Sequence, residues 1–314
     1  MHSKMKPDNS ALAFIGICRV HVRAALVLAY ITCNLAFWVI PLLVLVVCKW
    51  FVPISSMRTA IYGMMAWIYR AAVQMNGWIL FQGLKIQLDL TGINQSFHGN
   101  FYLALCNHQS WSDIFILQHI LNRKVPIMKF LVKKELMYLP VVGLICWAYD
   151  FPFLHRGKKN EKRPEKSYRM KDSQTLNRAL THFLRSSATI MNFTEGTRFT
   201  PLKANRQQSP YQYLMKPKAG GLIAIYKMIG QDLTAVLDFT IVYDAPKPNF
   251  WRFIGGRIQR VKVHLDTIPS QELKENFGLP ETNFNPDRAI EWVNQRWSQK
   301  DRQIEHISSD FRCC

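Results

Sequence analysis

Acidic residues are scarce in this sequence. Its 314 residues include 21 Asp and Glu against 40 Lys and Arg, which gives a formal net charge of +19. Such an excess of positive charge indicates an acidic partner, namely nucleic acid, anionic lipid headgroups or a phosphorylated substrate. Hydrophobic residues make up 49% of the chain and charged residues 19%, a balance that excludes an intrinsically disordered protein.

Cysteine frameworks and several familiar catalytic motifs are also absent. The seven cysteines form no Cys-x-x-Cys pair, and their odd number fits thiols in a reducing compartment. No Gly-x-Ser-x-Gly, His-Glu-x-x-His or Gly-rich phosphate loop occurs, which disfavours a serine hydrolase, a zinc site and a nucleotide-phosphate site. Two adjacent cysteines, Cys313 and Cys314, resemble a prenylation signal, and a frayed tail is the simpler interpretation.

Charge is missing altogether from a long apolar stretch near the N-terminus. Residues 24–48 contain no charged side chain and would span about 37 Å as a helix, enough to cross a hydrocarbon core of about 30 Å. Asn34 and Pro41 interrupt the stretch, so a kink or a re-entrant hairpin is an alternative to one straight spanning helix. A second apolar stretch, residues 59–81, contains Arg70 and is more typical of an amphipathic helix at a membrane surface.

These two stretches divide the chain into two parts. Residues 1–82 are expected to form a membrane anchor of one spanning or hairpin helix plus an amphipathic helix, and residues 83–314 the main domain. More Lys and Arg residues precede the first stretch than separate the two, which places the main domain in the cytoplasm if both stretches cross. The lipid bilayer is therefore the first expected partner.

In the main domain, short apolar runs alternate with helical patterns. The expected strands are residues 101–106, 151–154, 188–193, 235–242 and 258–265, and the expected helices are residues 112–121, 172–185, 218–229 and 286–304. This alternation predicts an α/β fold, with a mostly parallel sheet flanked by helices behind the N-terminal membrane-anchoring helical segment. A polar, basic stretch at residues 157–171 is expected to form a surface loop.

A polar cluster with catalytic potential directly follows the first expected strand. Residues 107–113 read Asn-His-Gln-Ser-Trp-Ser-Asp, so His108 would lie at the mouth of the sheet, where α/β proteins bind ligands. Asp113 lies five residues later and can fold back beside the imidazole. A carboxylate on one ring nitrogen fixes the tautomer and leaves the other nitrogen free to accept a proton. A structural His–Asp pair is the alternative interpretation.

A second polar segment follows another expected strand. Residues 193–198 read Phe-Thr-Glu-Gly-Thr-Arg, and both segments could converge on one edge of the sheet. Gly196 permits a close backbone approach, and Arg198 presents a fork of donors suited to a phosphate monoester. A turn carrying a surface salt bridge is the alternative interpretation.

Together the two segments resemble the signatures of the glycerophospholipid acyltransferases, the family that includes 1-acyl-sn-glycerol-3-phosphate acyltransferase. Residues 107–113 are similar to its Asn-His-x-x-x-x-Asp signature, and residues 193–198 to its Phe-Pro-Glu-Gly-Thr-Arg signature, with Thr194 in place of the proline. Arg156 matches the arginine of the intervening block. The resemblance covers roughly residues 80–265 and is strongest to the bacterial YihG-like branch.

The resemblance implies a reaction and a role for each candidate residue. His108, held by Asp113, would take the proton from a lysophospholipid hydroxyl, by default that of 1-acyl-sn-glycerol 3-phosphate. The freed oxygen would attack the thioester of acyl-CoA or acyl-carrier protein, giving phosphatidic acid without a covalent acyl-enzyme, metal or cofactor. The residues implied to bind the acceptor headgroup are Arg156, Glu195, Gly196, Thr197 and Arg198. The implied location is the bacterial inner membrane.

Alternative interpretations concern a thiol and the basic clusters. Cys106 beside His108 could act as a nucleophile, but its place on a buried strand favours a structural thiol. The basic clusters are Arg123, Lys124, Lys129, Lys133 and Lys134, then Arg156, Lys158, Lys159, Lys162, Arg163, Lys166, Arg169 and Lys171. With a membrane anchor in the same chain, anionic lipid, a phosphorylated substrate, coenzyme A or an acyl-carrier protein explains these clusters better than nucleic acid does. The rival class is a non-catalytic, membrane-anchored lipid-binding protein, which an acyl-transfer assay would distinguish.

Overall fold

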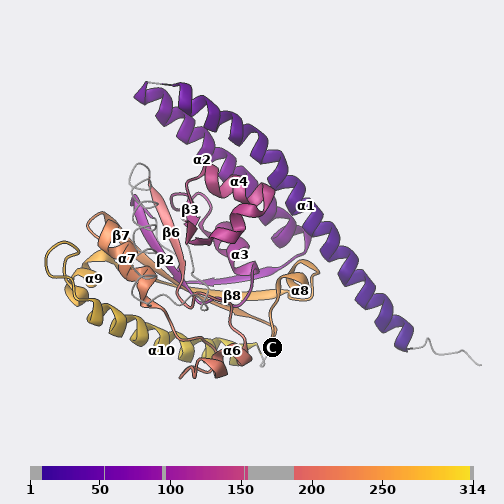
Figure 1. The fold of residues 1–314 in the computed structure, drawn as a ribbon. Helices are drawn as coiled ribbons and strands as arrows, with labels where there is room; N and C mark the ends of the chain where they lie inside the picture. The colour runs from indigo at the N-terminus through magenta and orange to yellow at the C-terminus, as the bar shows by residue number, and fades with distance from the viewer. Residues whose placement is uncertain (1–8, 53, 94–96, 152, 155–186, 312–314) are drawn as a thin grey trace, which may run out of the picture.

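A mixed α/β fold is seen in the computed structural model, which describes residues 9–52, 54–93, 97–151, 153–154 and 187–311 (Figure 1). The α-helices are α1 (Asn9–Phe51), α2 (Ser55–Gly77), α3 (Ser112–Leu121), α4 (Pro140–Ala148), α6 (Pro201–Arg206), α7 (Ala219–Ile229), α8 (Phe250–Ile254), α9 (Ser270–Phe277) and α10 (Pro286–Asp310). The strands are β1 (Gln87–Thr91), β2 (Phe101–Cys106), β3 (Met128–Phe130), β4 (Val132–Lys133), β5 (Phe153–Leu154), β6 (Ala188–Phe193), β7 (Leu233–Tyr243) and β8 (Arg260–Pro269). A π-helical turn, Trp78–Gly83, follows α2, and a 3-10 turn, Lys134–Tyr138, precedes α4.

Within the described residues, the main sheet has six strands in the order β1-β8-β7-β2-β6-β3. The four strands β7, β2, β6 and β3 are parallel to one another, whereas β8 runs antiparallel to β7 and pairs in parallel with β1. β2 and β6 are almost wholly buried, as expected of central strands covered on both faces; β2 is apolar throughout, whereas β6 also buries Thr189 and Asn192. The predicted α/β fold with a mostly parallel sheet is therefore confirmed.

Helices cover both faces of this sheet (Figure 1). One apolar core joins α1, α2, α3, α4 and α8 to the face that carries Tyr102, Ala104 and Cys106 of β2. The other core joins α7, α9 and α10 to the face that carries Leu103 and Leu105. Because side chains alternate across a strand, β2 contributes to both cores and lies at the centre of the molecule.

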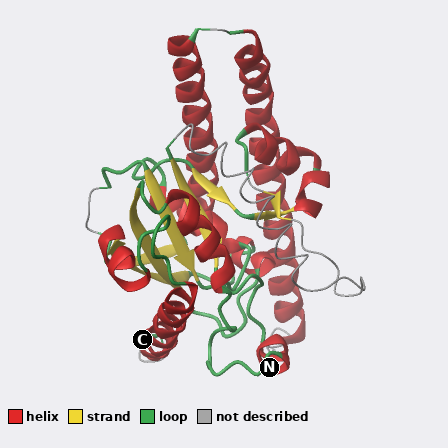
Figure 2. Ribbon diagram, turned by 60° about the vertical axis from the view of Figure 1, so that its left-hand side comes forward, coloured by secondary structure: helices red, strands yellow, loops and turns green. Residues whose placement is uncertain are grey.

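The N-terminal apolar stretch is one uninterrupted helix, so the predicted re-entrant alternative is wrong. α1 continues through Asn34 and Pro41 to its end at Phe51. The Asn34 amide donates to the backbone oxygen of Ala72 and to Asn76 Oδ1, both at 2.9 Å. The polar side chain therefore binds α2, and the two helices lie side by side as an antiparallel hairpin (Figure 2).

The hairpin of α1 and α2 lies within residues 1–82, the predicted membrane anchor. Among the helices that the structure describes, α1 alone is long and apolar enough to cross a membrane, since an 18-residue window within Phe14–Phe51 has a mean hydropathy of 2.4. Its 43 residues span about 65 Å, more than the thickness of a hydrocarbon core. Buried residues of α1 and α2 also belong to the core beneath the sheet, so the hairpin packs directly on the main domain.

Most element boundaries follow the sequence, with one misplaced strand. Residues 151–154 were expected in the main sheet, but β5 pairs only with β4 in a separate two-stranded ladder. The expected helix at residues 172–185 and loop at residues 157–171 lie outside the described residues. Two strands of the main sheet, β1 and β3, were not predicted; β1 is mostly exposed and β3 has only three residues, so neither has a clear apolar pattern.

Candidate active site

The two polar segments meet at one edge of the sheet, as their positions after strands predict. β2 and β6 are parallel neighbours with Cys106 opposite Phe193, the last residue of each strand. Residues 107–113 and residues 194–198 therefore leave the sheet side by side. This edge holds the carboxyl ends of parallel strands, where α/β proteins place their ligand sites.

Asp113, in the first turn of α3, holds the His108 imidazole. Its Oδ2 lies 2.8 Å from His108 Nδ1 and accepts from the backbone N–H groups of Gln109 at 2.8 Å and Ser110 at 3.0 Å. Its Oδ1 accepts from the Tyr243 hydroxyl. Asp113 is fully buried, whereas 15% of the His108 side chain is accessible. With Nδ1 donating to the carboxylate, Nε2 is the nitrogen that can accept a proton.

The second segment fixes the backbone of His108 from both sides. The His108 N–H donates to Glu195 Oε1 at 3.1 Å, and its carbonyl oxygen accepts from the Phe199 N–H at 2.7 Å. The Phe193 ring lies against the imidazole, with ring centroids 3.9 Å apart and an angle of 19° between planes. The two sequence segments thus form one structural unit, in which the second positions the histidine of the first.

Glu195 is buried behind the histidine and does not lie on the surface of the site. Besides His108, its carboxylate accepts from the backbone N–H of Met215 at 3.1 Å, so each oxygen has a backbone donor. Burial raises the pKa of Glu195 to about 8, although both backbone hydrogen bonds favour the ionised form. These contacts assign Glu195 a positioning role; its predicted contact with an acceptor headgroup stays a prediction.

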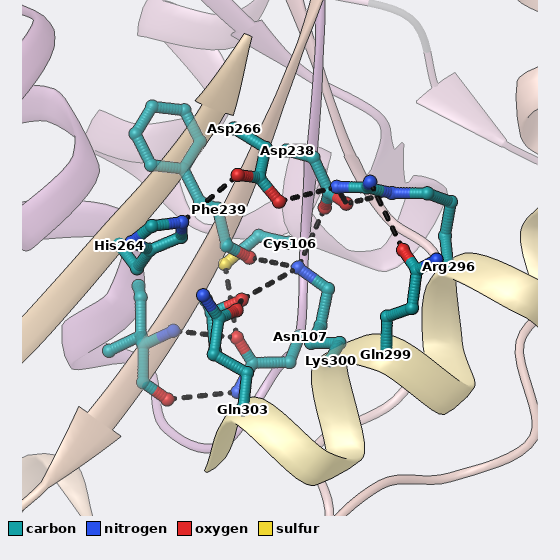
Figure 3. Close-up of polar contacts among 12 residues, drawn as sticks. Cys106, Asn107, Asp238, Phe239, His264, Asp266, Arg296, Gln299, Lys300 and Gln303 are labelled. Atoms are coloured by element: carbon teal, nitrogen blue, oxygen red, sulfur yellow. Dashed lines mark hydrogen bonds and ion pairs between the residues drawn. The ribbon is translucent and has the colours of Figure 1, made fainter. Parts of the chain in front are cut away.

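Asn107 ties the end of β2 to β7 (Figure 3). Its Nδ2 donates to the backbone oxygen of Ile241 at 2.9 Å, and its Oδ1 accepts from the Ile241 N–H at 2.8 Å. Beside it, Cys106 is buried and donates weakly from Sγ to Asn107 Oδ1 at 3.6 Å. Burial raises the pKa of the Cys106 thiol, which disfavours a thiolate and supports the structural interpretation of this cysteine.

A partly exposed loop, residues 196–198, follows Glu195 beside His108. Gly196 adopts a left-handed backbone conformation with φ of 68°, where glycine is favoured, and the loop then turns toward α6. The Lys203 ammonium, from α6, donates to Thr197 Oγ1 at 3.0 Å and to the Arg198 carbonyl at 3.1 Å. The Arg198 guanidinium lies over the Trp111 ring at 5.5 Å, which leaves a cation exposed near His108.

The predicted site residues therefore fall into three groups. His108 and Asp113 form a hydrogen-bonded pair, Gly196, Thr197 and Arg198 form the adjacent loop, and Glu195 lies beneath both. Arg156 lies outside the described residues, so its predicted role stays a prediction. Within the described part of the first basic cluster, Lys129 is buried, and its burial lowers its pKa to about 8. It does not belong to an exposed basic surface.

Sequence reasoning missed three contributors to the site. Tyr243 comes from β7, 130 residues after Asp113, and Lys203 and Trp111 act through a side-chain contact with the 197–198 loop. No short sequence spacing links Tyr243 to the segment of His108 and Asp113. The only available signal was its position at the carboxyl end of a predicted strand parallel to the strand before His108.

This arrangement is suited to general base catalysis. An accessible imidazole nitrogen can take a proton, and the buried carboxylate on the other nitrogen stabilises the imidazolium that forms. The adjacent exposed guanidinium can bind an anionic group of a substrate whose hydroxyl meets Nε2. Both features face the same edge of the sheet.

Comparison with known proteins extends these observations. The model of a family described as Acyltransferase matches residues 87–244, a range that includes both polar segments. An uncharacterised acyltransferase of Schizosaccharomyces pombe is 23% identical over 239 residues, covering 70% of this chain and 63% of the relative. 1-Acyl-sn-glycerol-3-phosphate acyltransferase 2 of Brassica oleracea is 26% identical over 249 residues, covering 74% of this chain and 59% of the relative.

The fold has a counterpart among solved structures. The crystal structure of the 1-acyl-sn-glycerophosphate acyltransferase PlsC of Thermotoga maritima superposes with a TM-score of 0.55 at 14% identity, covering 92% of this chain and 97% of that chain. At this identity the match concerns the fold. The chain spans 63% and 59% of the length of the two relatives above.

Proposed function

Since this chain belongs to the Acyltransferase family, we propose that it transfers a fatty acyl group from a thioester to the free hydroxyl of a lysophospholipid. The observation that carries the proposal is the His108–Asp113 pair at 2.8 Å, with the imidazole at an accessible edge of the sheet. Because His108 Nδ1 donates to Asp113, His108 Nε2 is the base. The hydrogen bond from the His108 N–H to Glu195 holds the backbone of the histidine.

The proposed reaction is a direct transfer. His108 Nε2 takes the proton of the acceptor hydroxyl as its oxygen attacks the thioester carbonyl carbon. The tetrahedral intermediate collapses, the carbon–sulfur bond breaks, and the leaving sulfur takes the proton back from the imidazolium. The products are the acylated phospholipid and the free thiol, and the imidazole returns to its initial state.

The proposed acceptor is 1-acyl-sn-glycerol 3-phosphate, and the proposed product is phosphatidic acid. The phosphate monoester of this acceptor suits the exposed Arg198 guanidinium beside His108. The name of the Brassica oleracea relative also specifies 1-acyl-sn-glycerol 3-phosphate as its acceptor. Another lysophospholipid is the second candidate. Acyl-CoA and acyl-carrier protein are the proposed donors, because both are acidic and the chain carries a net charge of +19.

The experiment uses membranes from cells that express the full chain. Labelled acyl-CoA and acyl-carrier protein are offered separately with a panel of lysophospholipids, and membranes carrying His108→Ala serve as the blank. Label should enter phosphatidic acid fastest, and only with the unaltered protein. Absence of transfer to every acceptor from either donor would overturn the proposed function.

The proposed location is a membrane, with the catalytic domain on the cytoplasmic face of a bacterial inner membrane. The support is α1, whose apolar Phe14–Phe51 segment has the length and composition of a spanning helix. Assignment to the bacterial YihG-like branch is likewise a proposal and rests on the motif pattern. The full chain should stay in the membrane fraction after a high-salt wash and an alkaline wash; release by salt alone would contradict an apolar anchor.

A further inference from the structure

Tyr243 extends the candidate catalytic pair from a third strand. β7 runs parallel to β2 with Phe239 opposite Cys106, and it continues four residues beyond that level to Tyr243. The extra length carries the tyrosine past the end of β2 to the start of α3. Its side chain belongs to the same core as α3, and only 5% of the residue is exposed.

The hydroxyl of Tyr243 completes the hydrogen bonds of the buried carboxylate. Three donors bind Asp113 Oδ2, one of which is His108 Nδ1, whereas Tyr243 donates to Oδ1. Burial first, and then the Asp113 carboxylate, raise the pKa of Tyr243 well above its usual value. The phenol therefore keeps its proton across the physiological range and always acts as the donor.

We propose that Tyr243 is a positioning residue that fixes the orientation of Asp113 and limits its basicity, and thereby sets the proton affinity of the His108 imidazole. A hydrogen bond to an ionised carboxylate stabilises that charge and weakens the pull of the carboxylate on a neighbouring cation. The imidazolium beside a fully hydrogen-bonded Asp113 is thus less stabilised than it would be beside a bare one. Catalysis near neutral pH needs this moderation, because a base that stays protonated cannot accept a proton.

The other ionisable groups near the pair come from separate elements. Cys106 of β2 and Glu195 after β6 interact electrostatically with Asp113, and Asp238 of β7 and Lys300 of α10 act on Cys106. Removal of the Tyr243 hydroxyl also removes its hydrogen bond with the Ser112 side chain, which carries no charge. A change in the pKa of His108 between the unaltered protein and Tyr243→Phe is therefore attributed to the lost bond to the charged Asp113 carboxylate.

The predicted effect of Tyr243→Phe is a rise in the pKa of His108. Loss of the hydroxyl leaves Asp113 Oδ1 without its tyrosine donor, so the carboxylate attracts the imidazolium more strongly, and we expect a rise of about 0.5–1 pH unit. Given the proposed function, the acidic limb of the pH profile of kcat/KM should move upward by the same amount. A residue that only fills space would lower turnover or stability and leave this limb in place.

The matched control is Tyr226→Phe. Tyr226, on α7 in the other core, is also buried, and its hydroxyl donates to the carbonyl of Gly278 at 2.9 Å. Tyr226→Phe removes the same hydroxyl group from a buried tyrosine, but its acceptor is an uncharged backbone carbonyl in the core on the other face of the sheet. The control should leave the pKa of His108 unchanged.

The decisive measurement is a histidine NMR titration of the full chain in detergent micelles, without substrate. The His108 resonance is assigned by its loss in His108→Ala. A rise of its pKa in Tyr243→Phe but not in Tyr226→Phe supports the proposal, and an unchanged or lower pKa overturns it. If Tyr243→Phe does not fold, a fluorinated tyrosine at position 243 strengthens the donor and should lower the pKa of His108; no change would again overturn the proposal. Because the titration needs no acyl transfer, failure of the proposed function is recognised separately.

Discussion

Two buried aspartates lie on opposite faces of the central sheet and have different kinds of partner. Asp113 accepts hydrogen bonds from backbone amides, a tyrosine and the titratable His108. Asp238 of β7 is bound by two cations of α10, Lys300 at 2.6 Å and Arg296 at 3.1 and 2.9 Å (Figure 3). One aspartate serves a residue that can gain and lose a proton, and the other serves residues that keep their charge.

We call Asp113 with His108 and Tyr243 the open cluster, and Asp238 with Arg296 and Lys300 the closed cluster. The two clusters also differ in whether, within the described residues, a polar atom remains without a hydrogen-bond partner. The Lys300 ammonium donates to Asp238, to the Phe239 carbonyl and to Thr240 Oγ1, so all three of its donors are used, and Lys300 is only 3% exposed. His108 is partly accessible and uses only Nδ1 for its aspartate. A closed, fully paired cluster is suited to holding α10 on the sheet, whereas a cluster with one open nitrogen is suited to catalysis.

The largest expected effect falls on the open cluster. His108→Ala should lower acyl transfer by about 10²–10⁴-fold, the usual contribution of a positioned base, and should leave the thermal midpoint within a few degrees. Transfer rates and thermal unfolding of the two purified proteins measure both quantities. The matched control is His306→Ala, an exposed histidine of α10 that should keep full activity. Near-normal transfer by His108→Ala would contradict the assignment of catalysis to the cluster of His108 and Asp113.

The opposite pattern is expected for the closed cluster. Lys300→Met leaves Asp238 with Arg296 as its remaining charged partner, and breaking a buried ion pair costs about 3–5 kcal/mol of unfolding free energy. The loss should lie near the lower end, because Arg296 still compensates part of the charge. Denaturant unfolding of Lys300→Met beside Lys227→Met, an exposed lysine of α7, tests this. Equal stability of the two variants would show that the cluster does not hold α10.

The local sequence pattern predicted the elements that carry the proposed catalytic pair, His108 and Asp113. β2 is a continuous apolar run and β6 a largely apolar one, because both faces of each strand are buried, and α3 begins at the predicted residue, Ser112. Since polar segments follow two parallel strands, their convergence could be inferred before the structure was known. The pairing of His108 with Asp113 could also be inferred, because the residues between them form one loop and one helical turn, which can fold back on itself.

Long-range pairings could not be predicted in the same way. Tyr243 and Asp113 are 130 residues apart, and Lys300 and Asp238 are 62 residues apart, so no periodicity links the partners. A buried lysine on an amphipathic helix has the sequence context of an exposed one until the facing strand is known. For Glu195, motif resemblance implied a ligand contact, and only the fold reveals two backbone donors on its carboxylate.

Glu195 is intermediate between Asp113 and Asp238. It is a buried acid whose hydrogen-bond donors are backbone N–H groups, with neither a titratable histidine nor a cation bound to its side chain among the described residues. Its folded-state pKa of about 8 lies above the ordinary value of 4.5, so the folded protein binds a proton that the unfolded chain has already released between these values. Stability from this group is therefore present below pH 4.5 and is lost as the pH rises toward 8. Between pH 6 and 8 the loss should reach about 2 kcal/mol.

Glu195→Gln tests this prediction because glutamine does not titrate. Denaturant unfolding at pH 6 and pH 8 should give a smaller decrease for the variant than for the unaltered protein. The variant should be less stable at both values, since its amide N–H₂ must face one of the two backbone donors. Equal decreases in the two proteins would mean that Glu195 is ionised throughout and that its backbone donors outweigh its burial.

The smallest effect is expected at the rim of the open cluster, where Arg198 lies exposed over Trp111. Arg198→Lys keeps the charge but loses the planar guanidinium, which can donate to two phosphate oxygens at once and lies over the Trp111 ring. We expect a rise of about threefold to tenfold in KM for the phosphorylated acceptor, with kcat nearly unchanged, because binding shared by the ground and transition states appears in KM. Steady-state kinetics should place the whole change on the acceptor and none on the thioester. Arg206→Lys, an exposed arginine of α6, is the matched control and should alter neither constant. If only KM for the donor rises, Arg198 binds the thioester carrier, and the open cluster must receive its acceptor from another direction.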